Sequence, residues 1–356
     1  MKKILLVLLT FGMLCGCQGK KEDTSVKIGV ILPLTGDLAF LGNFMKNSIL
    51  LNDSLNSELF IFEDCGGDPK QAVLATNKLI NTDKVSALIS SVSYLSESIN
   101  PLLKSKGIPH FILSFSPRLW KEDNVIQPFV STDQEAEMFV KYIAEHGISS
   151  VAFLRHQEPD ATYGYDNYVK PRLDSMNVSI TDIVFDNKTV RDFKNDILKI
   201  KSSNVQLLII QSLAYNIPNI ISAINTYDLR VPVLGDLNFL DIQDANTRSL
   251  VEGIPFIGVE YLVSENYKLY QTRYLERYNT LAFALGSFAY DLSILLDDSF
   301  MIFQDKSQQE IITHLNNLGR NNKRTISDNV YFGADGQLVV QYCLMKYQNG
   351  MIQMCE

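Results

Sequence analysis

Apolar positions along the chain fall into two recurring patterns, short apolar runs and longer stretches with helical spacing. The first apolar run, Lys27–Leu32, contains Ile, Val and Leu in succession, which is typical of a strand buried on both faces of a parallel sheet. Pro33 and Gly36 mark a turn after it. Apolar residues at helical spacing then predict a helix from about Phe40 to Leu55.

The same strand-and-helix unit repeats in two series, which meet near Gln134. The further strands that we expect are Leu59–Glu63, Val85–Ser90, His110–Leu113, Ser150–Leu154, Ile180–Phe185, Val205–Gln211, Val231–Leu234 and Ile257–Tyr261. The further helices that we expect are Lys70–Asn81, Glu135–His146, Tyr163–Met176, Asp192–Ser202, Asn216–Tyr227, Tyr267–Arg277, Ala282–Asp297 and Gln308–Leu318. The alternation predicts an α/β fold. The last three helices have no strands of their own, so we expect them to pack on a sheet already built.

The N-terminus has the pattern of a secretory signal. Lys2 and Lys3 precede an apolar run, Ile4–Leu14, that is too short to span a bilayer, which takes roughly 20 residues. The following Leu-Cys-Gly-Cys resembles the lipobox of bacterial lipoproteins. The resemblance implies that residues 1–16 are a signal peptide, that Cys17 is lipidated and that residues 17–25 are a tether. We therefore expect an extracytoplasmic protein that is lipid-anchored to the cell envelope, at its periplasmic face or the cell surface.

Charge and motif content exclude several function classes. The formal charge is −8, and removal of Lys2 and Lys3 with the signal takes it to −10. Such an acidic body has no electrostatic reason to bind nucleic acid or anionic lipid. We find no CxxC, His/Cys cluster, GxGxxG, P-loop or nucleophile elbow. We accordingly predict no metal, no cofactor and no enzymatic activity.

The C-terminus predicts a hairpin, Leu338–Tyr347 and Met351–Glu356, around Gln-Asn-Gly. If all three residues form the loop, Cys343 lies opposite Cys355, and an oxidising compartment would favour a disulfide between them. A two-residue Asn-Gly loop would instead put Cys343 opposite Glu356. Both registers are compatible with the sequence.

Several segments together resemble one known family in their order and spacing. They include IGVILPLTGDLAFLG, EDCGGDPKQAVLATNKLI, KGIPHFILSFSP and ATYGYDNYVKPRLDSM. The chain resembles the type I periplasmic binding proteins over residues 26–356, and among them the branched-chain amino-acid-binding receptors of ABC importers. The resemblance implies two Rossmann-like lobes joined by three crossings, with a ligand cleft between them. Lobe one would be residues 26–133 plus 264–330, and lobe two residues 134–263 plus 331–356.

The resemblance also implies how lobe one would hold a ligand. Family members hold the ligand carboxylate with hydroxyl and backbone N–H groups, and the matching positions here are Ser93 and either Ser114 or Ser116. Such donors at strand ends and helix N-termini suit a carboxylate. The alternative is that Ser93 caps the next helix and Ser116 begins a turn.

On lobe two, Asp236 lies near the family's acidic partner for the ligand ammonium, and Tyr163 would close over the ligand. Leu41 occupies a position where relatives often carry an aromatic residue, and Tyr215 or Leu213 lies near another lining position. Arg155 is outside the family pattern. It either reaches the cleft and favours an acidic ligand or lies in solvent.

The resulting hypothesis is a receptor that binds an amino acid or a similar small carboxylate, closes by hinge motion and presents its ligand to the membrane permease of an ABC importer. The alternative is a ligand sensor or regulator of an envelope partner that uses the same fold without transport.

Overall fold

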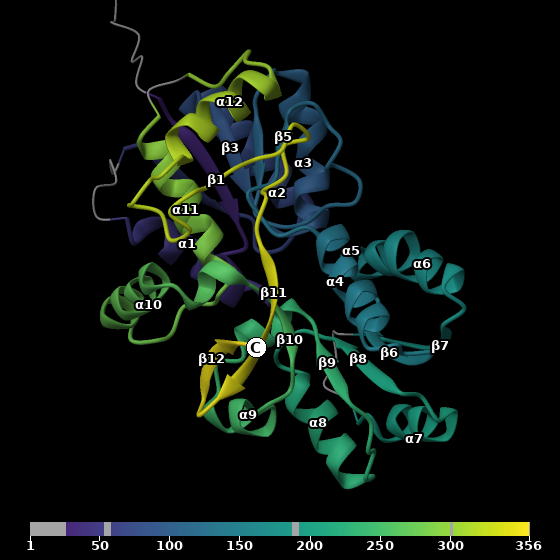
Figure 1. Cartoon of the computed structure of the whole chain (residues 1–356). Coiled ribbons are helices and arrows are strands. Elements are labelled where there is room, and N and C mark those ends of the chain that lie inside the picture. The colour runs from purple at the N-terminus through teal and green to yellow at the C-terminus, as the bar shows by residue number, and fades with distance from the viewer. Residues whose placement is uncertain (1–25, 53–57, 187–191, 300–301, 356) are drawn as a thin grey trace, which may run out of the picture.

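The computed structural model describes residues 26–52, 58–186, 192–299 and 302–355. The predicted signal peptide, the tether and Cys17 lie outside the described residues, as does Leu55, the expected end of the first helix. The described chain forms two α/β lobes, each with its own sheet (Figure 1). The predicted fold class is thereby confirmed. No helix in the described ranges is long and apolar enough to cross a membrane.

Five parallel strands form the sheet of the first lobe, in the order β2-β1-β3-β4-β5. They are β1 (Ile28–Leu32), β2 (Phe60–Asp64), β3 (Ala87–Ser90), β4 (His110–Ile112) and β5 (Val125–Ile126). All residues of β1 and β3 are buried, because helices cover both faces of the sheet. This burial explains the unbroken apolar run in β1. β5 has only two residues, too few for a periodic pattern, and was not expected.

Seven strands form the sheet of the second lobe, in the order β12-β11-β10-β9-β8-β6-β7. They are β6 (Ser150–His156), β7 (Ser179–Phe185), β8 (Leu207–Gln211), β9 (Val233–Gly235), β10 (Phe256–Val259), β11 (Tyr342–Gln348) and β12 (Met351–Met354). The strands from β6 to β10 pair in parallel, whereas β11 and β12 add antiparallel to β10. The C-terminal hairpin therefore extends the second sheet.

Twelve α-helices in the described ranges cover these sheets. They are α1 (Ala39–Leu50), α2 (Pro69–Lys78), α3 (Ser93–Ser105), α4 (Thr132–Glu145), α5 (Pro159–Gly164), α6 (Lys170–Ser175), α7 (Lys194–Ser203), α8 (Ile217–Thr226), α9 (Ala245–Leu250), α10 (Glu265–Tyr278), α11 (Gly286–Asp297) and α12 (Gln308–Gly319). Four short helical turns are η1 (Leu79–Asp83), η2 (Tyr165–Val169), η3 (Leu237–Asp241) and η4 (Glu260–Val263). α11 packs against α1 and α12 against β5, so the chain returns to the first lobe after completing most of the second.

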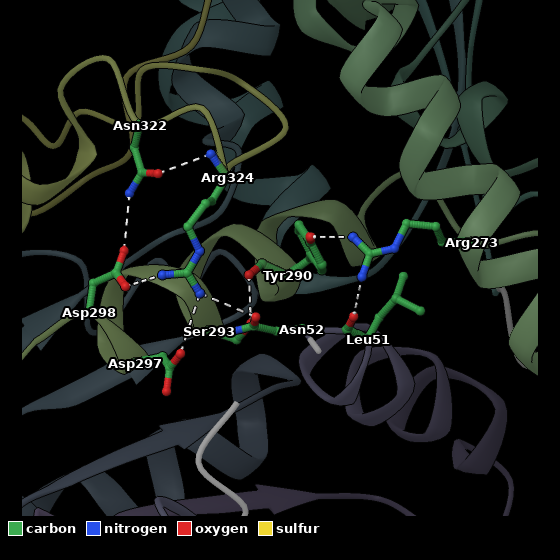
Figure 2. Close-up of polar contacts among 9 residues, drawn as sticks. All are labelled: Leu51, Asn52, Arg273, Tyr290, Ser293, Asp297, Asp298, Asn322 and Arg324. Carbon is green, nitrogen blue, oxygen red and sulfur yellow. Dashed lines mark hydrogen bonds and ion pairs between the residues drawn. The ribbon is translucent and has the colours of Figure 1, made fainter. Parts of the chain in front are cut away.

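Polar contacts join this returning segment to the start of the chain (Figure 2). Arg273 of α10 donates to the carbonyl oxygen of Leu51 at 3.0 Å, where a positive charge offsets the carbonyl end of α1. Arg324, in the loop after α12, forms ion pairs with Asp297 and Asp298 at the end of α11. Arg324 also donates to the Asn52 side chain at 3.4 Å. Residues distant in sequence therefore form one lobe.

The chain crosses between the lobes three times, at residues 127–131, 260–264 and 328–341. We call these the three crossing segments. The first and third are joined where Gln127 donates its backbone N–H to Gly336 and accepts that of Leu338, at 2.8 and 3.0 Å. The second and third are joined where the Glu260 N–H donates to the Gln341 oxygen at 2.9 Å. The three segments thus lie side by side in one hydrogen-bonded set.

The C-terminal hairpin has the two-residue loop. Gln348 pairs with Met351, and the backbone N–H of Cys355 donates to Leu344. In this register Cys355 shares a face of the hairpin with Leu344, so Cys343 points to the opposite face. Both cysteines are free thiols in the structure. The three-residue register was therefore wrong, and the Cys343–Cys355 disulfide inferred from it is not formed.

Candidate functional site

Hydroxyl groups gather where β3 and β4 end. The last residues of these strands pair directly, and Ser91 and Ser114 follow within two residues of that pair. Ser91 is 0% exposed, and the hydroxyl groups of Ser91 and Ser114 are buried without a hydrogen-bond partner among the described residues. A buried hydroxyl without a partner costs about 1–3 kcal/mol, which a bound ligand or water would recover. This edge of the sheet is therefore suited to an incoming acceptor.

Helix α3 begins beside these hydroxyls through a strained backbone. Val92 has φ 68° and ψ 115°, a region that a β-branched residue rarely adopts and that costs about 1–3 kcal/mol. The Val92 carbonyl accepts from Leu95 and Ser96 and so starts the helix. The N–H groups of the first turn have no acceptor within the helix, and the helix dipole is positive there. The strained turn brings this anion-favouring helix end next to Ser91.

The other two predicted serines make side-chain bonds within the lobe. The Ser93 hydroxyl donates to the Phe115 carbonyl at 2.7 Å and keeps its oxygen lone pairs for another donor. Ser116 is 0% exposed and donates to Glu97 at 2.9 Å. Glu97 also pairs with the exposed Arg118. Of the two alternatives after β4, Ser114 is therefore the better placed for a ligand.

The second lobe presents aromatic and acidic side chains toward this edge. The ring of Tyr163 in α5 lies 6.0 Å from that of Phe115, which is a contact between the two lobes. Tyr94 and Tyr215 are 45% and 46% exposed, on the first and second lobe. Burial is the main cause that raises the pKa of each phenol, and the Glu158 carboxylate adds to both shifts. Glu158 therefore lies close to tyrosines of both lobes.

Asp236 follows β9 at the predicted edge but is only 2% exposed. It caps η3: its carboxylate accepts from the backbone N–H groups of Asn238 and Ser212, both at 3.1 Å, and from the Asn238 side chain at 2.7 Å. Burial, and then the nearby carboxylate of Glu135, raise the pKa of Asp236 well above its usual range. A carboxyl so placed has little exposed surface and little tendency to carry charge, so its role as ammonium partner stays a prediction without geometric support.

The remaining predicted lining residues differ in exposure. Leu41 is half-buried and packs against the main core. Its neighbour Phe40 is 48% exposed, with its ring 6.2 Å from that of Phe283. The Phe283 ring also meets Phe44 edge-on at 4.1 Å. The aromatic surface here therefore comes from Phe40 and Phe283 rather than from position 41.

Arg155 fits neither of the two alternatives given for it. It is 5% exposed, and its guanidinium donates to both carboxylate oxygens of Asp182 at 2.9 Å. The same group lies 4.1 Å from the Tyr165 ring centre. Arg155 is thus part of the second lobe's packing, and its charge is already paired.

A serine, a histidine and an asparagine in the first lobe have the connectivity of a catalytic triad. Ser90 contacts His110 Nε2 at 2.7 Å, and His110 Nδ1 contacts Asn100 Oδ1 at 2.9 Å. Ser90 and His110 are 0% exposed and Asn100 is 3% exposed. Burial lowers the pKa of His110 to about 3, so the ring is neutral. All three side chains are buried, and they link β3, β4 and α3.

Sequence reasoning missed Ser91 and Glu158. Ser91 directly follows β3 and Glu158 lies two residues after β6, both at the predicted ligand-binding edge, so the position alone could have identified them. Their selection depended on burial and on missing partners, which are tertiary properties. Among the described residues, no group of three or more His, Cys, Asp or Glu side chains could hold a metal ion.

Comparisons with known proteins agree on the fold. The model of a family described as periplasmic binding protein matches residues 25–350. A Leu/Ile/Val-binding protein of Rhizobium johnstonii is 27% identical over 198 residues, which are 51% of this chain and 53% of that protein. The chain thus spans about half the length of the curated relative it matches.

Three solved structures are similar over nearly the whole chain. A leucine-binding protein of Thermotoga maritima has a TM-score of 0.73 at 20% identity, covering 93% of this chain and 98% of its own. A solute-binding protein of an ABC transporter from R. palustris, in complex with benzoate, has a TM-score of 0.76 at 16% identity. The match covers 93% of this chain and 95% of that protein. The third structure is a branched-chain amino acid transporter substrate-binding protein of Streptococcus pneumoniae in complex with isoleucine. It has a TM-score of 0.72 at 18% identity, and the match covers 92% of this chain and 98% of that protein.

Proposed function

This chain belongs to the periplasmic binding protein family, and on that premise we propose that it is an extracytoplasmic receptor that delivers a small carboxylate, such as an amino acid, to an ABC importer. The observation that carries the proposal is the pair of unpartnered hydroxyls, Ser91 and Ser114, beside the N-terminus of α3. Together they offer neutral donors and a favourable dipole without a buried cation. That combination suits a carboxylate group.

Two structural relatives support a carboxylate as the anchored group. One of these proteins is in complex with isoleucine and the other with benzoate, and these ligands share little besides a carboxylate. A site that binds the carboxylate in the same way in every relative, and differs between relatives in the residues around the rest of the ligand, could accept either type of ligand. We propose that the first lobe of this chain holds the carboxylate and that the second lobe selects the remainder.

Glu158 is the residue of the second lobe that we assign to a ligand ammonium, in place of Asp236. It is half-buried in the short loop between β6 and α5 and lies near enough to a tyrosine of each lobe for its charge to raise both pKa values. It forms no salt bridge with any described residue. A zwitterionic ligand would then lie between hydroxyls on one lobe and a carboxylate on the other. Lobe closure around it would exclude water and strengthen both contacts.

The lobe boundaries and the membrane anchor belong to the same proposal. We place lobe one at residues 26–133 plus 264–330 and lobe two at 134–263 plus 331–356, so that each boundary lies in a crossing segment or within two residues of one, and these segments can act as the hinge. Lipidation of Cys17 would hold the receptor near its permease. Mass spectrometry of the protein extracted from membranes tests the anchor, since an N-terminal peptide without acyl chains would contradict it.

Calorimetry with a panel of amino acids, aromatic carboxylates and their amides tests the proposal. We expect at least one carboxylate to bind and its amide to bind at least tenfold more weakly. Ser91→Ala or Ser114→Ala should each weaken binding about 10- to 100-fold, the range for hydrogen bonds to a charged group. Ser98→Ala is the matched control, since that hydroxyl lies on the neighbouring helix α3 and donates to the Leu95 carbonyl. The proposal would be refuted if no compound of the panel binds, or if an amide binds as tightly as the corresponding carboxylate.

A further inference from the structure

A cavity of about 610 Å³ lies among the three crossing segments. We call it the hinge cavity, and we propose that it binds a small organic cation with an apolar body. Nothing in the proposed carboxylate site involves these residues. Its volume is within the range of about 300–1,000 Å³ that is common for small-molecule sites.

Each crossing segment contributes to the walls of the hinge cavity. Pro128 comes from the first, Tyr261 and Val263 from the second, and Val330 and Val340 from the third. An occupant would therefore contact all three crossing segments, whose movement changes the orientation of one lobe relative to the other. A ligand shifts a conformational equilibrium when its contacts differ between the two states, so this position makes the hinge cavity a regulatory site.

The charge of the lining favours a cation. Glu260 and Asp291 are its acidic side chains, and Lys, Arg and His do not occur among the lining residues, all of which are described. Glu260 is exposed and forms no salt bridge with any described residue. Asp291 is 5% exposed and accepts from the Ile326 N–H at 2.7 Å and from Ser327. The exposed Glu260 carboxylate has no cation beside it among the lining residues, so it attracts a positive ligand and repels a negative one, and Asp291 adds no positive charge.

The apolar part of the lining favours an occupant with a hydrocarbon body. Phe288, Leu292 and Phe332 are buried and contribute to the walls. Tyr261 and Phe288 meet edge-on with ring centres 6.0 Å apart. Such rings accept apolar groups and attract cations at their faces. An organic ammonium ion matches both the acidic and the aromatic part of the hinge cavity.

Dibenzylammonium is a suitable probe because it lacks the carboxylate that the proposed ligand site requires. N-benzylbenzamide has a similar shape without the charge. Titration calorimetry of the mature full-length chain should show saturable binding of the amine and at least twofold weaker binding of the amide. Glu260→Gln should weaken amine binding about two- to fivefold, the range for an exposed charge pair. Equal affinity of the amine and the amide would overturn the assignment of a cation.

Two tryptophan substitutions test where the probe binds. Val339 is 48% exposed and lines the hinge cavity, so Val339→Trp should fill its mouth and abolish binding. Val184 is 46% exposed on β7, and Val184→Trp is the matched control that should leave binding intact. Unchanged binding by the Val339→Trp variant would refute the site.

Hydrogen exchange separates the hinge cavity from the carboxylate site. Bound dibenzylammonium should slow amide exchange in all three crossing segments together, and this protection should vanish in Val339→Trp. Protection confined to residues 91–94 and 114–116 would place the probe in the carboxylate site and overturn the inference. The proposed receptor function could fail in its own ligand panel while these results stand.

Discussion

His110 offers a quantitative test of the first lobe's interior. Its ring is fully buried and bonded to Ser90 and Asn100, and burial lowers its pKa from 6.5 to about 3. The unfolded chain therefore binds a proton at this residue below about pH 6.5, whereas the folded chain stays neutral. Since the unfolded state gains protons first, the stability contributed by His110 is complete above pH 6.5 and is lost as the pH falls toward 3.

The size of this effect follows from the two pKa values. Between pH 7.5 and 5.0, the free energy of unfolding should lose about 2 kcal/mol through His110 alone. Two buried carboxyl groups act in the opposite direction. Burial raises the pKa of Asp241 and Asp291 to about 7, so the folded chain gains protons there before the unfolded chain does. The wild-type curve combines these effects, and a variant at position 110 isolates one of them.

The measurement compares the wild type with His110→Gln by urea unfolding at pH 7.5 and 5.0. Trp120, the one tryptophan of the sequence, belongs to the first lobe and reports its unfolding by fluorescence. The stability advantage of the wild type over His110→Gln should shrink by about 2 kcal/mol at the lower pH. His146→Gln, at an exposed histidine, is the control and should show no such loss. An advantage that is unchanged between the two pH values would refute the reasoning.

Three further outcomes follow from the structure. Arg155→Met should destabilise the second lobe by about 2–3 kcal/mol, because it leaves a partly buried carboxylate without its cation, and thermal unfolding measures the loss. Alkylation of the denatured chain without reductant should modify both Cys343 and Cys355, and an unmodified pair detected by mass spectrometry would contradict the hairpin register. Gly42→Ala should destabilise the first lobe by about 2 kcal/mol or more, because the added methyl group would collide with the Pro33 carbonyl. A melting temperature equal to that of the wild type would count against this close packing.

Local pattern predicted the elements of this chain well where they are long and buried. The apolar run at Lys27–Leu32 is β1 within one residue, and Val205–Gln211 contains β8. Element ends were less accurate. The first helix ends at Leu50, and the expected helix Tyr163–Met176 begins four residues earlier and passes through the wider turn η2. The end of a helix or strand depends on capping residues and on packing against neighbouring elements, and the spacing of hydrophobic residues along the sequence does not encode either.

Sequence by itself determined the alternation of strands and helices, the class of fold and the sheet edge where polar residues would collect, because strand direction carries each strand's following loop to that edge. Tertiary structure decided which of those residues are available. Asp236 became a buried cap and Arg155 a paired charge, while Ser91 and Ser114 kept unpartnered hydroxyls. The physical reason is that burial and hydrogen-bond partners come from segments far away in the chain, so no local pattern encodes them.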